Sequence, residues 1–202
     1  MDVYATEHEQ IETLKKWWKE NGKAVIAGVV LGLSVLLVFW TWRDHTRAQT
    51  EVASAEYQLL IGDVQKGDTK AGLQRGAHIR NEYANTPYAV FAALATAKLA
   101  LDKGDVKAAR ADLQWALEHA DQDSLRHIAR LRLARVMIDM GEAEAALGLL
   151  ASAQPDAFAA AYEEVRGDAY LKSGQADKAQ AAYQRALEHQ RKDAAQDPEQ
   201  GE

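Results

Sequence analysis

Six histidines and one pair of aspartates are the side chains of this sequence that could hold a metal ion. No two histidines stand three or four residues apart, so no helix would present two of them as ligands on one face. They are His8, His45, His78, His119, His127 and His189. Asp121 and Asp123 flank Gln122 without a third acidic residue at the spacing of a calcium loop. We therefore expect both aspartates at a helix start, and no metal site.

Catalytic motifs are also missing from the sequence, which has no phosphate-binding GxxxxGK loop, no GxGxxG, no HExxH and no GxSxG. The chain has no cysteine, which excludes a disulfide framework, a zinc ribbon and a thiol nucleophile. Its net charge of −6 leaves no broad basic surface for nucleic acid. We expect a protein that is not an enzyme, without a cofactor, a small-molecule substrate or a nucleic-acid partner.

Residues 24–42 form an apolar stretch of 19 residues without a charge. A helix of this length measures about 28 Å, close to the hydrocarbon core of a bilayer. Trp40 and Trp42 close the stretch, where indole rings favour the membrane interface. The stretch is too long, and its end too bulky, for a cleaved signal peptide. A buried core helix would show a polar face, so the pattern favours one uncleaved transmembrane helix.

Flanking cations predict the orientation of this helix. Four lysines precede the stretch, and two arginines follow it closely. They are Lys15, Lys16, Lys19 and Lys23 before it, and Arg43 and Arg47 after it. The excess of positive charge before the stretch predicts that the N-terminus lies inside the cell. Gly28 and Gly32 form a GxxxG pattern that could be a transmembrane helix contact, although glycine is also simply common in such helices.

Residues 1–23 are polar, with a short apolar face. Ile11, Leu14 and Trp18 stand at i, i+3 and i+7, on one side of a helix beside the lysines. The segment could lie along the cytoplasmic membrane surface. A solvated helix that continues straight into the span fits the pattern equally well.

Four glycines recur along the rest of the chain, each between two helical stretches. Gly67, Gly104, Gly141 and Gly174 are 37, 37 and 33 residues apart. Periods of this size are typical of stacked helical hairpins, which share a core that one hairpin cannot build alone. The tetrapeptide ALEH ends at His119 and again at His189, so both histidines are expected at equivalent helix ends.

Small and large residues alternate around the last three glycines as in tetratricopeptide hairpins. The first-helix positions hold Ala97, Ala134 and Gly167, then Ala100, Met137 and Tyr170. The second-helix positions hold Ala109, Ala146 and Ala179, then Leu113, Leu150 and Tyr183, then Ala116, Ala153 and Ala186. The first unit has Gly72 and Gly76 where an alanine and a large residue are expected, which we interpret as a degenerate N-terminal cap.

The sequence thus predicts an all-α protein with one N-terminal transmembrane helix and a tetratricopeptide-like superhelix of stacked hairpins. The expected parts are a cytoplasmic segment at 1–23, the span at 24–42, a periplasmic repeat domain at 43–192, and a disordered polar tail at 193–202.

The N-terminal sequence of the chain resembles that of the YfgM family, the ancillary subunits of the bacterial SecYEG translocon. Residues 3–28 carry the likeness, and a second match is LRLARV at 131–136. The matching N-terminal residues are Tyr4, Gln10, Glu12, Lys15, Trp17, Trp18, Glu20, Asn21, Gly22 and Lys23. The likeness extends over about residues 3–187, and the family has no catalytic residues to carry over.

The resemblance implies an inner-membrane protein with a cytoplasmic N-terminus and a periplasmic tetratricopeptide-like domain. It implies association with the SecYEG translocon and with a membrane-anchored periplasmic chaperone of the prolyl-isomerase type. The implied role is to help pass newly exported proteins to periplasmic chaperones. A membrane-anchored scaffold for another envelope or division complex is the alternative, since repeats alone do not specify a partner.

Tetratricopeptide domains usually bind partners on the concave side, along the first helix of each hairpin. Lys98, Arg135 and Asp168 occupy equivalent positions there and are our candidate partner-binding residues. An ordinary solvated face is the alternative interpretation.

Overall fold

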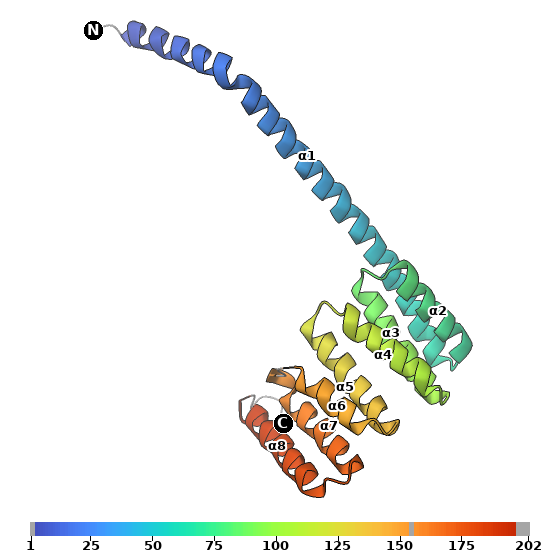
Figure 1. Ribbon diagram of the computed structural model, residues 1–202. Coiled ribbons are helices and arrows are strands. Elements are labelled where there is room, and N and C mark those ends of the chain that lie inside the picture. The colour runs from blue at the N-terminus through green and yellow to red at the C-terminus, as the bar shows by residue number, and fades with distance from the viewer. Residues whose placement is uncertain (1–2, 154–155, 197–202) are drawn as a thin grey trace. The chain divides into compact units, whose positions relative to one another are not determined.

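The computed structural model describes residues 3–153 and 156–196. Within these ranges it contains eight α-helices and one short 3-10 helix, and no strand (Figure 1). The chain divides into two compact units, residues 1–48 and residues 49–202. The all-α fold class expected from the sequence is confirmed.

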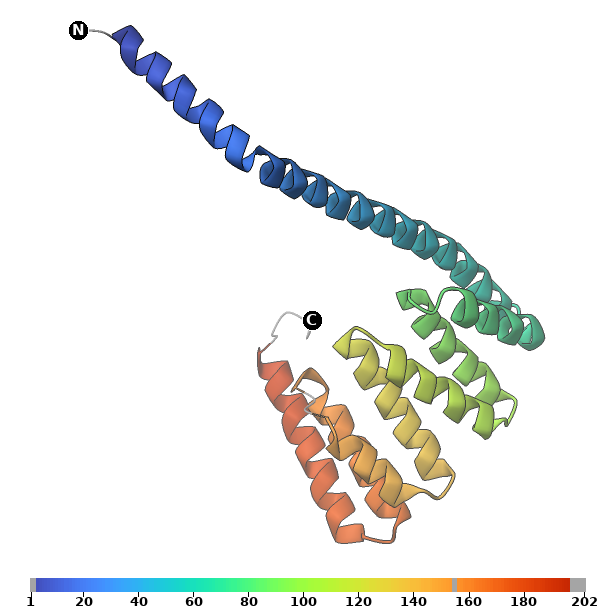
Figure 2. The same ribbon diagram turned by 45° about the horizontal axis from the view of Figure 1, so that its top comes forward.

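Helix α1 runs from Val3 to Gln65 and belongs to both units. It contains a stretch that is long and apolar enough, by length and composition, to cross a membrane. No described residue covers that stretch, whose large apolar side chains from Ile26 onwards are exposed, while Val25 is half-buried. Within the first unit, the N-terminal part of α1 bends away from the line of the apolar stretch (Figures 1 and 2).

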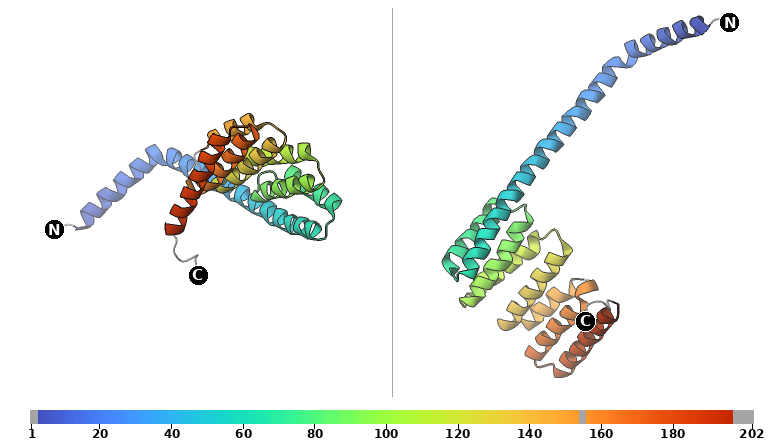
Figure 3. Two further views of the ribbon diagram at one scale, coloured as in Figure 1. Left: turned by 90° about the horizontal axis from the view of Figure 1, so that it is seen from below. Right: turned by 180° about the vertical axis from the view of Figure 1, so that it is seen from behind.

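The second unit is a row of antiparallel helices in which each helix lies beside the next (Figure 3). After the end of α1 come α2 (Thr69–Glu82), α3 (Pro87–Asp102), α4 (Val106–His119), α5 (Asp123–Asp139), α6 (Ala143–Ala151), the 3-10 helix η1 (Asp156–Phe158), α7 (Ala159–Lys172) and α8 (Ala176–Gln196). The repeat domain is therefore built from helical hairpins, as predicted.

The four recurring glycines make the turns within these hairpins. Gly67, Gly104, Gly141 and Gly174 have φ values of 72°, 78°, 83° and 74°, in the left-handed region that side chains disfavour. The residue after each glycine donates its backbone N–H to a carbonyl five residues earlier, as Glu142 does to Met137 at 2.8 Å. This bond closes the end of a helix, so the predicted turn positions are confirmed.

The predicted small and large positions form the core of the repeat domain. All of them are buried except Tyr170, Tyr183 and Ala153, which are half-buried. At Gly167 the requirement for a small residue is strict, because a Cβ atom there would overlap the ring of Tyr183. The alternation therefore reflects close contact between the two helices of each hairpin.

The two glycines by which the first hairpin departs from the repeat pattern are contact positions, and its interpretation as a degenerate N-terminal cap stays a prediction. A Cβ atom on Gly72 would lie 2.8 Å from Cδ1 of Leu99, and one on Gly76 would overlap Cγ2 of Thr96. Both partners lie on α3, so α2 packs against the next hairpin through its bare backbone.

Two further expectations need correction. Helix α8 continues to Gln196, so residues 193–196 are helical and do not belong to a disordered tail; residues 197–202 lie outside the described residues. His119 ends α4 as expected, but His189 lies well inside α8 because that helix is longer. Ala194, Ala195 and Gln196 all favour helix, which explains the extension without an apolar pattern.

Candidate protein-binding groove

A groove of about 380 Å³ lies between α3, α4 and α5. Its apolar walls come from residues that face each other across the two hairpins: Leu94, Ala97 and Leu101 on α3, Leu113 on α4, and Val136 on α5. Leu94, Leu113 and Val136 are buried, whereas Leu101 is partly open to solvent. Ala97, the small position of its hairpin, leaves room between the two leucines of α3.

Charged side chains line the same groove. Lys98 comes from α3, while Arg132, Arg135 and Asp139 come from successive turns of α5. These four residues carry a net charge of +2, whereas the whole chain carries −6. The groove is therefore a basic and apolar site on an acidic protein.

The cations of the groove are only weakly engaged within the protein. Lys98 pairs with Asp102 one turn along α3, at 3.1 Å, and Arg135 pairs with Glu164 at 3.5 Å. Exposed pairs of this kind contribute at most about 1 kcal/mol. Within the described ranges Arg132 has no ion-pair partner. All three cations could therefore exchange to a carboxylate brought by a ligand.

The structure places two of the three candidate partner-binding residues in this groove. Lys98 and Arg135 both line it, but Asp168 does not. The Asp168 carboxylate instead accepts a hydrogen bond from the Tyr183 hydroxyl at 2.8 Å. Burial and this hydrogen bond together raise the pKa of Tyr183 to about 12.

Arg132 is the groove residue that sequence reasoning missed. It stands three residues before Arg135, so the two share one face of α5. Both belong to the segment 131–136, which carries the second match of the resemblance. The spacing of three residues between Arg132 and Arg135, which places both on one helix face, was the signal that could have identified Arg132.

The candidate transmembrane contact is separate from the groove. Gly28 and Gly32 lie in the apolar stretch of α1, and a Cβ atom on either would have no described neighbour within 4 Å. The backbone is thus open at both positions, and contact with another helix there stays a prediction.

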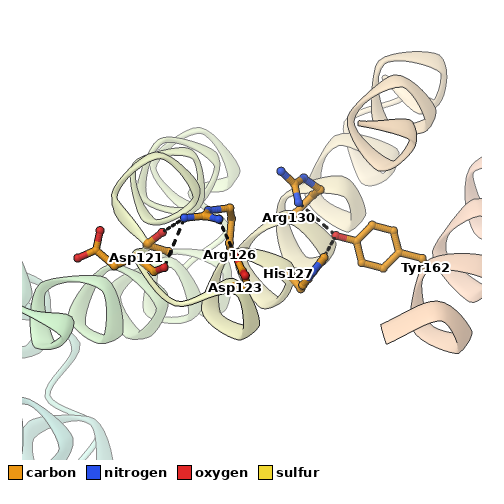
Figure 4. Close-up of polar contacts among 7 residues, drawn as sticks. Asp121, Asp123, Arg126, His127, Arg130 and Tyr162 are labelled. Atoms are coloured by element: carbon orange, nitrogen blue, oxygen red, sulfur yellow. Dashed lines mark hydrogen bonds and ion pairs between the residues drawn. The ribbon is translucent and has the colours of Figure 1, made fainter. Parts of the chain in front are cut away.

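A polar network at the start of α5 positions the helix that carries the groove arginines (Figure 4). Tyr162 of α7 is completely buried, and its hydroxyl lies 2.7 Å from His127 Nδ1 and 3.4 Å from Arg130 Nη1. Arg130 donates to the hydroxyl oxygen, and the hydroxyl also forms a hydrogen bond with the imidazole nitrogen of His127. The network therefore ties α5 to α7.

Arg126 closes the first turn of α5 in the same view (Figure 4). It donates to the Asp123 carboxylate at 2.6 Å and to the carbonyl of Ala120 at 2.8 Å. Asp123 is the first residue of α5, so its predicted place at a helix start is confirmed. Its negative charge lies in the first turn of α5, where it complements the helix dipole, and it also forms the ion pair with Arg126.

This architecture has a counterpart among known families. The model of the family described as tetratricopeptide repeat-like domain matches residues 15–199. The chain is therefore a helical-repeat protein of the tetratricopeptide-like class.

Curated relatives specify the family further. A protein from Haemophilus influenzae is 35% identical over 187 residues, which cover 91% of this chain and 90% of the relative. One from Escherichia coli is 32% identical over 184 residues, with 91% and 88% covered. One from Neisseria gonorrhoeae is 25% identical over 198 residues, with 96% and 93% covered. All three are named ancillary SecYEG translocon subunit. The chain belongs to this family, which confirms the resemblance found in residues 3–28.

Proposed function

We propose that the chain is a non-enzymatic ancillary subunit of the SecYEG translocon that recruits a periplasmic chaperone to newly exported proteins. The observation that carries the translocon part of this proposal is the similarity, over 91% of the chain, to proteins named ancillary SecYEG translocon subunit. The groove adds a surface on which a protein partner could dock. The catalytic motifs sought in the sequence are absent from it.

In this proposal residues 24–42 cross the bacterial inner membrane once. Residues 1–23 lie in the cytoplasm and the repeat domain lies in the periplasm. The apolar stretch of α1 supports the span. The excess of lysines before it supports the orientation.

The proposed mechanism is tethering without chemistry. The span holds the repeat domain beside the export channel, with Gly28 and Gly32 as the candidate contact to a translocon helix. A chaperone bound to the repeat domain then stays near each emerging chain. Its local concentration rises without any new contact to that chain.

The groove is the proposed docking site for the chaperone, a membrane-anchored protein of the prolyl-isomerase type. Lys98, Arg132 and Arg135 surround an apolar floor. This combination fits a partner segment that carries carboxylates beside aliphatic or aromatic side chains. The ion pairs of Lys98 and Arg135 within the protein are weak, so replacing them by pairs with a partner's carboxylates would cost little free energy.

Purification of the tagged full-length protein in mild detergent, with mass spectrometry of the bound proteins, tests the proposal. The wild type should enrich both the translocon and the chaperone. Reversing the three groove cations to glutamate should remove the chaperone and leave the translocon, because the span is unchanged. The variant is Lys98→Glu, Arg132→Glu and Arg135→Glu.

A matched control carries the same change of charge on exposed lysines outside the groove. It combines Lys103→Glu, Lys107→Glu and Lys172→Glu, and it should retain both partners. Gly28→Leu with Gly32→Leu should lower recovery of the translocon. If the wild type enriches other envelope or division proteins and neither expected partner, the alternative scaffold function replaces this one.

A further inference from the structure

The segment before the apolar stretch carries an apolar face that no described residue covers. Between residues 11 and 23, Ile11 is 48% exposed, and Trp17 and Trp18 are 49% and 51% exposed. Leu14 falls in register with Ile11 and Trp18. Residues 19–23 separate Trp18 from the apolar residues 24–42. The exposed face therefore ends about one and a half helical turns before the proposed membrane span.

Cations occupy the rest of the same helix: Lys16, Lys19 and Lys23 lie opposite the apolar face, and Lys15, four residues after Ile11, lies beside it. Lys15, Lys16, Lys19 and Lys23 are all exposed, and only Glu12 and Glu20 oppose them between residues 11 and 23. The remaining acidic residues of the segment lie further from the span, within residues 1–10. The positive charge is therefore concentrated in the turns nearest the apolar stretch, on an otherwise acidic protein.

The residues just before the apolar stretch make defined contacts within the helix. The ring of Trp18 lies along the helix over Gly22, where a Cβ atom would stand 3.3 Å from ring atom Cε2. Gly22 is buried beneath this ring, although Asn21 is only half-buried and Lys23 is exposed. The Asn21 amide donates to the carbonyl of Trp17 at 3.1 Å. Asn21 and Gly22 are both weak helix formers, and this region of α1 bends (Figure 2).

From these observations we infer that residues 11–23 form an interfacial helix that binds the surface of a membrane rich in anionic phospholipids. The face of Ile11, Trp17 and Trp18 enters the boundary between headgroups and acyl chains, which favours indole rings. The lysines of the other face reach the lipid phosphates. A bend before the span lets one helix both lie on the membrane and cross it.

The absence of cysteine from the chain gives a direct test. Single cysteines are introduced into the full-length protein, labelled with a nitroxide and reconstituted without partners into lipid nanodiscs. Collision rates with oxygen and with a water-soluble nickel chelate report whether each label lies in lipid or in water. The label positions are Ile11→Cys on the apolar face, Glu12→Cys and Glu20→Cys on the charged face, and Val35→Cys in the span.

In nanodiscs containing phosphatidylglycerol, the Ile11 label should favour oxygen, and the Glu12 and Glu20 labels should favour the nickel chelate. In phosphatidylcholine alone the difference should shrink. Replacing one lysine by glutamine should weaken surface binding by about fivefold, since each lysine near an anionic surface contributes about 1 kcal/mol.

The inference rests on the proposed membrane span, and the Val35 label separates the two. If that label lies in lipid while labels on both faces of residues 11–23 remain equally open to the nickel chelate, the interfacial helix is wrong and the span stands. This result would also be expected if the face serves another protein. If the Val35 label lies in water, the proposed span itself is wrong.

Discussion

Leucine side chains have opposite surroundings in the two units of the chain. Leu36, in the apolar stretch of α1, is 54% exposed, whereas Leu150 of α6 has no exposed surface. Both lie in regular α-helices, so neither helix propensity nor residue type explains the difference. The neighbouring helices do: those of the repeat domain give Leu150 an apolar environment, whereas no described residue covers the apolar stretch of α1.

Replacing each of these two leucines by alanine should give the largest difference in the free energy of unfolding of the repeat domain. Leu150→Ala should lower the free energy of unfolding of the repeat domain by about 2–5 kcal/mol, because it leaves a cavity in a packed core. Leu36→Ala should leave the repeat domain unchanged. Thermal unfolding in detergent, followed by circular dichroism, measures both. Equal midpoints for the two variants would remove the distinction between the units.

Glycines offer a second and smaller contrast. Gly76→Ala should cost the repeat domain about 1–3 kcal/mol, because the new methyl group would overlap Thr96 and force α2 away from α3. Gly28→Ala adds the same group at an open position of α1 and should not shift the unfolding midpoint. A harmless Gly76→Ala would mean that α2 and α3 are not in close contact.

A third comparison separates backbone conformation from packing inside the repeat domain. Gly141→Ala should destabilise it by about 1 kcal/mol, since φ is 83° there and alanine disfavours the left-handed region. Gly148→Ala lies inside α6 with open space around it and should stabilise by about 0.5–1 kcal/mol. Chemical denaturation of the two variants gives the sign of each effect.

The smallest expected effect is a pH dependence confined to the second unit. Burial and the hydrogen bond to Asp168 raise the folded pKa of Tyr183 to about 12, above its ordinary value of 10.0. Ionisation therefore favours the unfolded chain, and this contribution to stability is complete below pH 10 and is lost as the pH rises towards 12. Tyr183→Phe should reduce the loss of stability between pH 9 and pH 11, measured by thermal unfolding. Tyr170→Phe is the matched control, and an identical loss in the wild type and the Tyr183 variant would contradict the assignment.

Much of the repeat domain could be predicted because its requirements are local and recur. A left-handed turn needs glycine, and a close helix crossing needs a small residue, so Gly104, Gly141 and Ala134 mark their positions without any knowledge of partners. The role of Gly76 could not be predicted in this way. It depends on Thr96, which belongs to the following hairpin and follows no repeat rule.

The groove was only partly predictable for a similar reason. Repeat register assigned one position to each hairpin, which found Lys98 and Arg135 but not Arg132. Register also treated Asp168 as equivalent, whereas the hydroxyl of Tyr183 holds its carboxylate. Side chains that replace one another in a repeat pattern still meet different neighbours, so the charges of a site follow from the packed structure.

The nearly identical glycine turns have a consequence for how such a chain can change over time. Because each hairpin makes its internal turn with the same backbone geometry, a duplicated hairpin would keep the packing of its two helices and could stack on its neighbours through surfaces that already fit. The domain can therefore gain or lose length in whole modules while each module keeps its internal design. A groove formed between two hairpins could be copied with them, and its charges could then diverge toward a second partner.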